Sequence, residues 1–494
     1  MLWWQRVDSP QTRGDVPEVA GITHDSRAVK PGFAFAAVPG QRADGHDFLA
    51  AAFHAGATAA VVQADHEAQW VDFEGRLPLV VVPDVRAALG LLAAAVYGDP
   101  SSKLRLIGVT GTDGKTTTAH LIGHVLDRCG LACGYLSSVG FEYGTGFELN
   151  ATHMTTLEAT SIQSMLADAV RAGRRSMAVE ASSEGLAQAR LKGCEFDVAV
   201  FTNLTRDHLD FHGSMERYLE AKGRLFTMLQ RPTAKRFPRT AVLNADEDSS
   251  AYLRGLSEAD VVTYGFKDAD LRGTDVESED FVIRFSVHHA GEKLPALLPM
   301  LGRFNVYNSL AALAVATSQG VALSDAVQAL ASFPGVPGRL ERIDQGQAFA
   351  VFVDIASTPA ALENVLRVLR PATPGRLWAV FGAAGGRDAA RRRGMGEVAA
   401  LLTDRCVLTN EDPRDEDPDA IIETIAAALR DGGRAEGSDF VRIPDRRSAI
   451  QHAFEHAEAG DTVLLAGKAT ETTMVFADGP VAWDERAIAI ELLR

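Results

Sequence analysis

The residues whose types and spacing are best suited to chemistry form a glycine-rich loop over residues 108–118, with the sequence GVTGTDGKTTT. Gly111 and Gly114 would let backbone N–H groups close around phosphate oxygens. Lys115 would reach the β- and γ-phosphates of a nucleotide, and the Thr116 hydroxyl would ligate Mg²⁺. The loop therefore predicts a site for a nucleoside triphosphate.

The context of this loop favours phosphate binding over the alternative of an ordinary glycine-rich turn. An apolar run over 104–109 predicts a strand before the loop, and a helical stretch begins at Ala119 after it. The strict phosphate-loop pattern GxxxxGK[ST] is not met, because Val109 stands where its first glycine would be. Strand, loop and helix in this order still match the geometry that phosphate binding requires.

Other short β-branched runs predict the framework that positions the loop. They alternate with Ala- and Leu-rich stretches of helical length, which indicates parallel sheets covered by helices on both faces. The fold class is therefore α/β. The predicted strands lie at 104–109, 177–180, 197–201, 240–244, 350–354, 377–381 and 462–466.

Length and composition limit the possible classes of protein. At 494 residues the chain suggests about three domains. Short stretches containing Pro, Gly or Ser near 98 and 335 indicate domain boundaries and divide the chain into 1–98, 99–335 and 336–494. The net charge of −16 speaks against a nucleic-acid-binding protein, because neutralising phosphates requires a basic face. An anionic substrate would have to be held by local positive charge.

The start of the chain and its cysteines predict a cytoplasmic location. No basic segment followed by an apolar stretch opens the sequence, and the most apolar run, 89–97, is too short to span a bilayer. Four scattered cysteines without a CxxC pair predict reduced, mostly buried thiols and no zinc site.

Several motifs in order along the chain resemble the Mur ligase family. Residues 110–118 (TGTDGKTTT) look like its ATP loop, in which Asn is commoner at the position of Asp113. The N-terminal motifs resemble the MurE-type branch, the UDP-N-acetylmuramoyl-L-alanyl-D-glutamate–amino-acid ligases. The matching segments are 25–27, 31–32, 40–46, 201–210, 222–226, 338–341 and 466–468.

This resemblance implies three domains, with a central P-loop-type parallel sheet and a Rossmann-like C-terminal domain. It implies an ATP-dependent ligase that adds meso-diaminopimelate, lysine or ornithine through an acyl phosphate. The reaction belongs to cytoplasmic peptidoglycan synthesis, and so to cell-wall biogenesis, cell shape and cell division. We expect a monomer that uses ATP, Mg²⁺ and small-molecule substrates.

The resemblance also implies which residues perform the chemistry. Lys115 would neutralise phosphate charge, Glu180 and Thr116 would bind magnesium, and His208 would bind a second metal. Lys222 would be carbamylated and would support that metal as an anion. Taken alone, each has a simpler interpretation: Glu180 could cap a helix, His208 could be structural, and Lys222 could be a solvated lysine.

The substrates are assigned in the same way, by resemblance. The ATP-binding residues would be Gly111, Thr112, Asp113, Gly114, Lys115, Thr116, Thr117, Asn305, Asn308 and Arg339. The residues for the UDP-sugar peptide would be Ser26, Gln41, Arg42, Ala43, Thr155, Thr156, Ser182, Gln188 and Arg190. Arg190 suits a carboxylate or phosphate, whereas the Ser and Thr residues could instead cap helices.

The C-terminal domain would hold the incoming amino acid, and here the chain departs from the family. The contacts would be Arg387, Glu411, Asp412, Pro413, Arg414, Gly467 and Glu471. Asp412 replaces the Asn of the specificity motif, which would favour a plain diamine, while Arg414 favours diaminopimelate. Ser357 and Glu184 stand where the family has His, and Ala469-Thr470 replaces its Gly-His.

Two other functions remain open from the sequence. One is a ligase resembling folylpolyglutamate synthase, against which the N-terminal motifs at 25–27 and 45–46 argue. The other is a catalytically inactive nucleotide-binding protein. In that case Lys115, Thr116, Glu180, His208 and Lys222 could have changed freely, yet all five are present.

Overall fold

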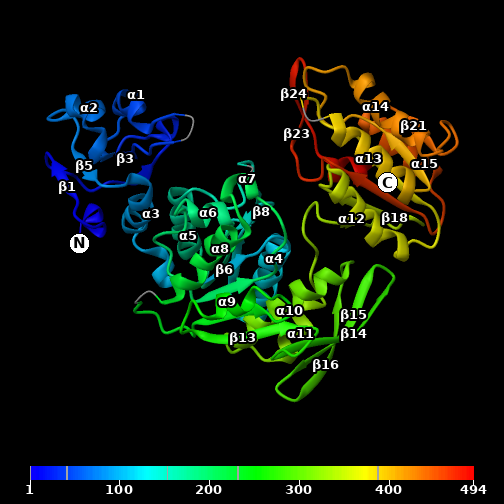
Figure 1. The fold of residues 1–494 in the computed structure, drawn as a ribbon, viewed down its shortest axis with the longest axis horizontal. Coiled ribbons are helices and arrows are strands. Elements are labelled where there is room, and N and C mark those ends of the chain that lie inside the picture. Colours follow the sequence, from blue (N-terminus) through cyan, green and yellow to red (C-terminus); the bar gives the residue numbers. More distant parts are fainter. Residues whose placement is uncertain (1, 41–42, 153, 231–232, 387–388) are drawn as a thin grey trace. The chain divides into compact units, whose positions relative to one another are not determined.

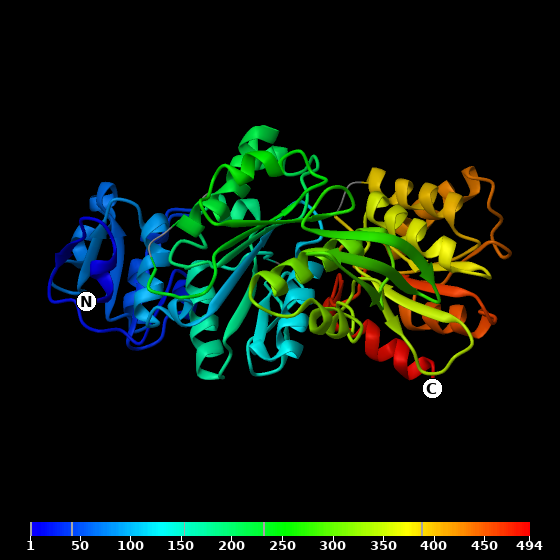
Figure 2. The same ribbon diagram turned by 90° about the horizontal axis from the view of Figure 1, so that it is seen from below.

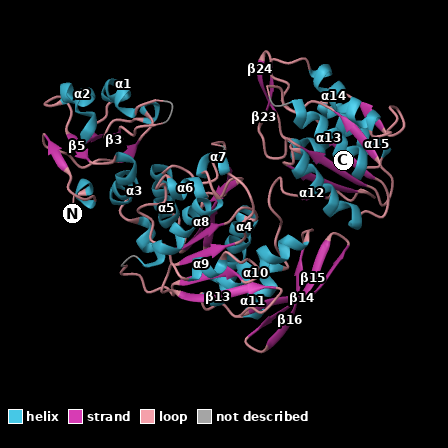
Figure 3. Ribbon diagram, viewed as in Figure 1, coloured by secondary structure: helices cyan, strands magenta, loops and turns pink. Residues whose placement is uncertain are grey.

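The computed structural model describes residues 2–40, 43–152, 154–230, 233–386 and 389–494. They form two compact units. The first comprises Met1–Thr274, Ser286–Ala296 and Val306–Ala331, and the second Asp275–Phe285, Leu297–Asn305 and Ser332–Arg494. Figure 1 follows the chain through both, and helices and strands alternate through most of it (Figures 1 and 3).

The first sheet is built from residues before position 83. Its strand order is β1-β5-β4-β3-β2, and every neighbouring pair is parallel except β1 with β5. Alternate residues of β4 and β5 enter cores on opposite faces, one closed by α3 and the other by α1 and α2. The elements are β1 (Gln11–Arg13), β2 (Gly21–Thr23), β3 (Phe33–Ala36), α1 (Leu49–His54), β4 (Ala59–Gln63), α2 (Glu67–Trp70), β5 (Leu79–Val82) and α3 (Val85–Val96).

The second sheet has eleven strands in the order β16-β15-β14-β13-β12-β11-β6-β10-β7-β8-β9. Strands β7, β10, β6, β11, β12 and β13 are parallel neighbours, and β7, β8 and β9 are antiparallel. Figure 2 shows the central strands running side by side. The strands are β6 (Arg105–Thr110), β7 (Cys133–Leu136), β8 (Gly140–Glu142), β9 (Phe147–Leu149), β10 (Ser176–Glu180), β11 (Val198–Phe201), β12 (Thr240–Asn244), β13 (Asp260–Gly265), β14 (Leu271–Glu279), β15 (Val282–His289) and β16 (Glu292–Leu298).

Strand β6 lies between β10 and β11. After β6 the chain continues on one side of it, through β7 and β10, and then crosses to β11 on the other side. Glu180 is in register with Val109, and Phe201 with Thr110, so the carboxyl ends of all three strands meet at one edge. Ligands of α/β proteins bind at such a switch point. The helices of this part are α4 (Lys115–Leu126), α5 (Ala159–Arg171), α6 (Ser183–Ala187), α7 (Leu209–His212), α8 (Met215–Thr227), α9 (Ser250–Arg254), α10 (Arg303–Ser318) and α11 (Leu323–Leu330).

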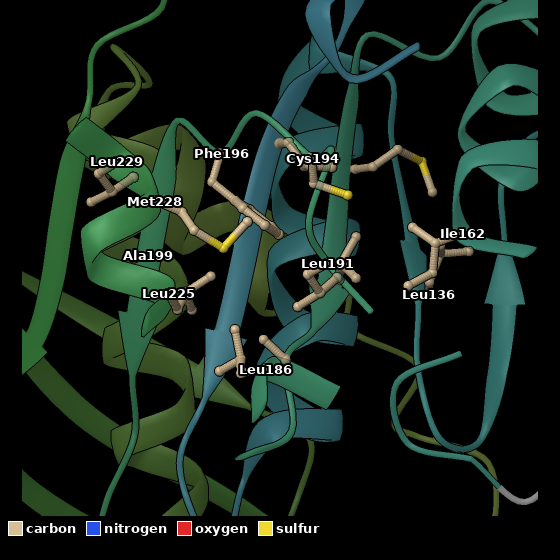
Figure 4. Packing of buried hydrophobic residues seen from close by; sticks show 14 of the residues in the cluster. Leu136, Ile162, Leu186, Leu191, Cys194, Phe196, Ala199, Leu225, Met228 and Leu229 are labelled. Carbon is tan, nitrogen blue, oxygen red and sulfur yellow. The ribbon is translucent and has the colours of Figure 1, made fainter. Parts of the chain in front are cut away.

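An apolar core fixes this edge from one side of the sheet. One buried cluster contains Leu186 of α6, Leu225 of α8 and Phe196, which lies just before β11 (Figure 4). Residues of β7, β10 and β11 belong to the same cluster. Leu225 is fully buried, and a Cβ on Gly108 of β6 would lie 2.6 Å from its side chain. The glycine therefore lets α8 approach the strand that carries the phosphate loop.

The third sheet belongs to the second unit and has the order β17-β18-β22-β19-β20-β21. Only β17 is antiparallel to its neighbour, and separate buried cores cover the two faces. The elements are β17 (Glu341–Ile343), β18 (Ala350–Asp354), α12 (Pro359–Leu369), β19 (Leu377–Phe381), α13 (Ala389–Leu402), β20 (Arg405–Leu408), α14 (Pro418–Asp431), β21 (Phe440–Arg442), α15 (Arg446–His456), β22 (Thr462–Ala466), β23 (Thr473–Phe476), β24 (Gly479–Ala482) and α16 (Glu485–Leu492).

The α/β prediction is confirmed, and each of the seven predicted strands is present within one residue of its expected ends. The expected start of the helix at Ala119 was wrong. Helix α4 begins at Lys115, because Gly114 takes a left-handed conformation with φ 80° and ends the loop there. The proposed boundaries at 98 and 335 stay predictions.

The cysteines and helices bear on the other predictions. All four cysteines are free, and three of them are buried. Within the described residues, no helix combines the length and apolar content needed to cross a bilayer.

Candidate active site

The phosphate loop has a conformation that only glycine accommodates at two positions. Gly111 has φ 150°, and a Cβ there would lie 1.8 Å from the Thr202 hydroxyl oxygen. At Gly114 the left-handed backbone would place a Cβ 2.4 Å from Oδ1 of Asn308. The loop is therefore closely packed on both sides, with the first turn of α4 directly behind it.

The segment after β11 holds the loop in place by hydrogen bonds. The Asp113 N–H donates to Oδ1 of Asn203 at 2.8 Å, and Thr202 Oγ1 donates to the Asp113 carbonyl at 2.7 Å. The Thr112 N–H donates to the Asn203 carbonyl at 2.9 Å, and the Thr112 hydroxyl accepts from the Thr205 N–H at 3.0 Å. These contacts preorganise the loop before any nucleotide binds.

Two lysines converge on the Gly111 carbonyl oxygen. Nζ of Lys115 donates to it at 3.1 Å and to the Thr112 carbonyl at 2.6 Å, while Nζ of Lys222 donates to it at 2.6 Å. Lys222 comes from α8, is fully buried and lies 4.1 Å from the centre of the Tyr218 ring. Burial, reinforced by the Lys115 ammonium, lowers the pKa of Lys222 to about 6. The interpretation of Lys222 as a solvated lysine was therefore wrong.

A serine that sequence reasoning missed connects the two predicted magnesium ligands. Thr116 Oγ1 lies 2.9 Å from Ser138 Oγ, and Oε1 of Glu180 accepts from the Ser138 N–H at 2.9 Å and hydroxyl at 3.3 Å. Glu180 is 1% exposed at the end of β10. A hydroxyl and a carboxylate are hard oxygen donors, which suit Mg²⁺.

His208 lies in a left-handed turn before α7, with φ 51°, and its side chain is 47% exposed. Its Nδ1 is 3.5 Å from Oε1 of Glu184, and its Nε2 is 3.4 Å from Oδ2 of Asp207. The departure from the family at position 184 therefore places a carboxylate beside the predicted metal-binding histidine. Two carboxylates therefore lie next to the His208 ring.

Four of the five residues expected near the muramoyl-dipeptide form one cluster. Thr156 Oγ1 donates to the Glu180 carbonyl and accepts from the Ser182 N–H, each at 2.8 Å. Arg190 donates to the Thr156 carbonyl and to Oε1 of Gln188, each at 2.9 Å, and pairs with Glu158. Ser182 also caps α6 by accepting from the Gly185 N–H. Thr155 is half-buried.

The remaining predicted ATP contacts lie in three places. Asn308 accepts from the Thr118 hydroxyl at 3.2 Å, next to Gly114, and Thr117 lies half-buried in the first turn of α4. Asn305 Nδ2 donates to the Leu301 carbonyl at 2.6 Å. Arg339 is half-buried beside β17, and its Nε is buried without a hydrogen-bond partner in the described structure.

In the first sheet, Ser26 follows β2 and Ala43 lies in the loop after β3, so parallel pairing puts both at one edge. Gln41 and Arg42 lie outside the described residues. The same loop leads to an unexpected group, Asp44, His46 and His66, which among the described residues is the one His/Cys/Asp/Glu trio close enough to share a metal ion.

Hydrogen bonding explains the Asp44, His46 and His66 group without a metal. His46 Nε2 accepts from the Gln63 N–H at 3.0 Å, so its Nδ1 carries the proton and donates to Asp44 at 2.7 Å. His66 stacks on the His46 ring with centroids 4.5 Å apart. Both nitrogens of His46 are already used, and the group joins the Asp44 loop to the sheet.

Most residues predicted to hold the amino acid follow the carboxyl ends of β20 and β22. Glu411 is 6% exposed, and its Oε2 is buried without a hydrogen-bond partner in the described structure. Gly467, with φ 110°, has no Cβ, and one would lie 3.0 Å from that oxygen. Burial raises the pKa of Glu411 to about 7.

The departure at Asp412 is matched by a buried lysine. Nζ of Lys468 is fully buried and donates to Oδ1 of Asp412 at 2.7 Å and also to Glu471. Asp412 Oδ1 also accepts from the Val475 N–H, and the Arg414 N–H donates to the Val475 carbonyl. Arg387 lies outside the described residues.

The other departures lie in the loops after β18 and β22. Ala469 replaces a family glycine yet has φ 40°, the left-handed conformation that glycine adopts most readily. Pro413 is buried, and its carbonyl would lie 1.9 Å from a Cβ on Gly385. Ser357 is half-buried in the loop after β18.

A buried arginine that sequence reasoning missed connects two of these loops. Arg446, at the start of α15, donates to the Asn410 carbonyl at 3.1 Å and to the Ala466 carbonyl at 2.9 Å. It forms a fully buried ion pair with Glu485 of α16. Arg446 therefore fixes the backbone just before Glu411 and Gly467.

Comparison with protein families agrees with this geometry. Residues 18–97 match the Mur ligase family, catalytic domain, and residues 109–316 match the Mur ligase middle domain. Residues 338–469 match the Mur ligase, glutamate ligase domain. The three matches follow the order of the three sheets along the chain.

Individual relatives match over nearly the whole chain. The UDP-N-acetylmuramyl-tripeptide synthetase of Roseiflexus sp. (strain RS-1) is 43% identical over 96% of this chain and 94% of its own. A UDP-N-acetylmuramoyl-L-alanyl-D-glutamate–2,6-diaminopimelate ligase of Geobacillus thermodenitrificans is 40% identical over 97% and 95%. A solved structure of a ligase with the latter name has a TM-score of 0.69, with 32% identity over 96% and 94%. The chain belongs to the Mur ligase family.

Proposed function

We propose that this chain is the ATP-dependent ligase that joins the third stem-peptide amino acid to UDP-N-acetylmuramoyl-L-alanyl-D-glutamate, releasing ADP and phosphate. The observation that carries the proposal is the preorganised loop of Gly111 and Gly114, with Lys115 and Thr116 at the start of α4 and Glu180 beside them. The printed names of its relatives describe the same step of peptidoglycan synthesis.

The residues of the central sheet fit the first half of the reaction. The substrate carboxylate attacks the γ-phosphate of ATP and forms an acyl phosphate, with ADP as the leaving group. Lys115, now folded on its own loop, would turn to the phosphates and offset their charge. Thr116 and Glu180 would hold Mg²⁺, which lowers the repulsion between the two anions. Arg190 would bind a carboxylate of the dipeptide.

The loops of the third sheet fit the second half. The amine of the incoming amino acid attacks the acyl phosphate, and phosphate leaves as the amide forms. Glu411, Glu471 and Gly467 would receive its side chain, with Arg414 and Arg387 for carboxylates. The Asp412–Lys468 ion pair offsets the added charge at position 412, so diaminopimelate, lysine and ornithine all remain candidates.

We further propose that Lys222 acts as a carbamate. An unprotonated lysine amine attacks CO₂, forms an N–C bond and releases one proton, which converts the neutral amine into an anionic carbamate. Burial and the low pKa of Lys222 favour the unprotonated amine. Its hydrogen bond to the Gly111 carbonyl places this amine at the phosphate loop. The carbamate and Glu184 would supply negative charge for a second metal, and His208 would supply a nitrogen ligand.

The test for Lys222 combines mass and activity. Intact-protein mass spectrometry under CO₂ should show the added carboxyl group in the parent and not in Lys222→Ala. That variant should be inactive and partly rescued by short-chain carboxylates, whereas a fully active Lys222→Ala would contradict the proposal.

The main function is tested by phosphate release from ATP in the presence of UDP-N-acetylmuramoyl-L-alanyl-D-glutamate and each of the three amino acids. We expect turnover with at least one and identify the product by mass. No turnover with any of them would refute the ligase and favour an inactive nucleotide-binding protein. We also propose a cytoplasmic monomer with boundaries near 98 and 335, which size-exclusion chromatography with light scattering and limited proteolysis would test.

A further inference from the structure

The loop between β7 and β8 carries Ser138, whose hydroxyl contacts both predicted magnesium ligands. Ser138 Oγ lies within hydrogen-bond distance of both Thr116 Oγ1 and Glu180 Oε1, and the Ser138 N–H donates to the same Glu180 oxygen. Thr116 and Glu180 come from α4 and β10, so this one residue joins the two elements that would supply the magnesium ligands.

The direction of each hydrogen bond follows from the chemistry of the groups. A carboxylate only accepts, so the Ser138 hydroxyl donates its single hydrogen to Glu180. Ser138 Oγ can then only accept from Thr116. The Thr116 hydroxyl hydrogen is thereby turned towards Ser138, and its lone pairs are turned away from Ser138.

The backbone around Ser138 is rigid enough to maintain this arrangement. The Ser137 hydroxyl donates to the Gly140 carbonyl at 2.8 Å and accepts from the Val139 and Gly140 N–H groups. Ser137 is buried, and its Oγ also lies 2.9 Å from Nε2 of the buried His120 in α4. The turn is therefore fixed to α4, the helix that follows the phosphate loop.

We propose that Ser138 is a positioning residue that sets the hydroxyl of Thr116 and the carboxylate of Glu180 for binding Mg²⁺ with the nucleotide. A hydroxyl ligates a cation through a lone pair, so a Thr116 hydroxyl already donating to Ser138 is oriented before the cation arrives. Groups that orient metal ligands in this way affect metal affinity strongly. The inference rests on the proposed function only in naming Mg²⁺-nucleotide as the ligand.

The experiment measures Mg²⁺-dependent binding of ADP by the full chain, without any other substrate. Ser138→Ala removes the hydroxyl but keeps the backbone donor, and we expect the Mg²⁺ concentration for half-maximal ADP binding to rise about tenfold. Ser138→Thr keeps the hydroxyl and should restore the parent value. Ser249→Ala removes another half-buried serine hydroxyl of the same unit and should have no effect.

Turnover provides a second readout. In Ser138→Ala the KM for Mg²⁺-ATP should rise, while the KM for the UDP-linked substrate stays unchanged, a division that general loss of structure would not produce. An unchanged Mg²⁺ dependence in a folded Ser138→Ala would overturn the proposal, as would failure of Ser138→Thr to restore it. If Ser138→Ala does not fold, Ser138→Cys takes its place, with the same expected loss. A parent chain that binds Mg²⁺-ADP but shows no turnover would refute the ligase and leave this test intact.

Discussion

Replacing Lys222 by methionine should stabilise the protein and abolish its activity together. The side chain is fully buried, and its pKa of about 6 lies far below the value of 10.5 for a free lysine. The unfolded chain gains a proton at neutral pH that the folded chain does not bind, which favours unfolding. Methionine has a similar length and nothing to protonate.

The magnitude follows from the two pKa values. A pH of 7 is about 3.5 units below the pKa of Lys222 in the unfolded chain, so keeping the buried amine neutral costs about 5 kcal/mol. Methionine loses the hydrogen bond to the Gly111 carbonyl, worth about 1 kcal/mol. Lys222→Met should therefore raise the free energy of unfolding by about 3–4 kcal/mol at pH 7.

The pH dependence has a definite sign. Between pH 6 and 10.5 the unfolded parent binds the extra proton, so the stability of the parent rises with pH by up to about 1.4 kcal/mol per unit. The variant lacks this contribution. Its advantage should therefore shrink by about 3 kcal/mol between pH 7 and pH 9.

The assay is urea unfolding of both proteins at pH 7, 8 and 9 in CO₂-depleted buffer, because a carbamate would remove the amine from the titration. Lys267→Met, at an exposed lysine of the same unit, serves as the control and should change stability little at any pH. A Lys222→Met protein that is less stable than the parent, or whose advantage does not vary with pH, would refute the reasoning.

Three other substitutions test further parts of the site. Lys115→Ala should abolish phosphate release, because Lys115 is the one cationic side chain of residues 108–118, and near-normal activity would contradict that role. Gly111→Ala forces a Cβ against Thr202 and should abolish ADP binding in a calorimetric titration, whereas Gly346→Ala, with a similar backbone strain and open space, should not. Glu411→Gln should stabilise the protein by an amount that grows from pH 4.5 to pH 7 and reaches about 3 kcal/mol in urea unfolding. Over this range Glu411 ionises in the unfolded chain but keeps its proton in the folded one, where its pKa is about 7, so the parent loses stability. Equal pH profiles of parent and variant would contradict the burial of an ionisable Glu411.

Strongly apolar strands could be predicted from the sequence because parallel strands buried on both faces are continuous apolar runs. Strands β14 and β15 escaped prediction because exposed and buried residues alternate in them, and β1 and β2 because they are only three residues long. The phosphate loop was found through local spacing. Its backbone requirement at Gly111 follows from contact with Thr202, a residue that spacing alone does not connect to it.

The missed residues act through contacts between distant segments. Ser138 matters because β7 and β10 are neighbours, and Arg446 matters because it reaches Asn410 and Ala466. Neither residue has a local pattern that distinguishes it from an ordinary serine or arginine. The assignment of Lys222 shows the same limit, since only the fold shows that this lysine is buried beneath the loop.

The position of β6 between β10 and β11 has a consequence for how the protein acquires activity during folding. Its partners are distant in sequence, as the contacts of Arg105 with Ser176 across 71 residues and of Thr202 with Thr110 across 92 residues show. Closing such long loops is entropically costly and slow. Until β11 docks, the phosphate loop lacks Thr202 and Asn203, and until β10 docks it lacks Glu180. We therefore expect a partly folded chain not to hydrolyse ATP, because the same long-range pairings complete both the sheet and its site.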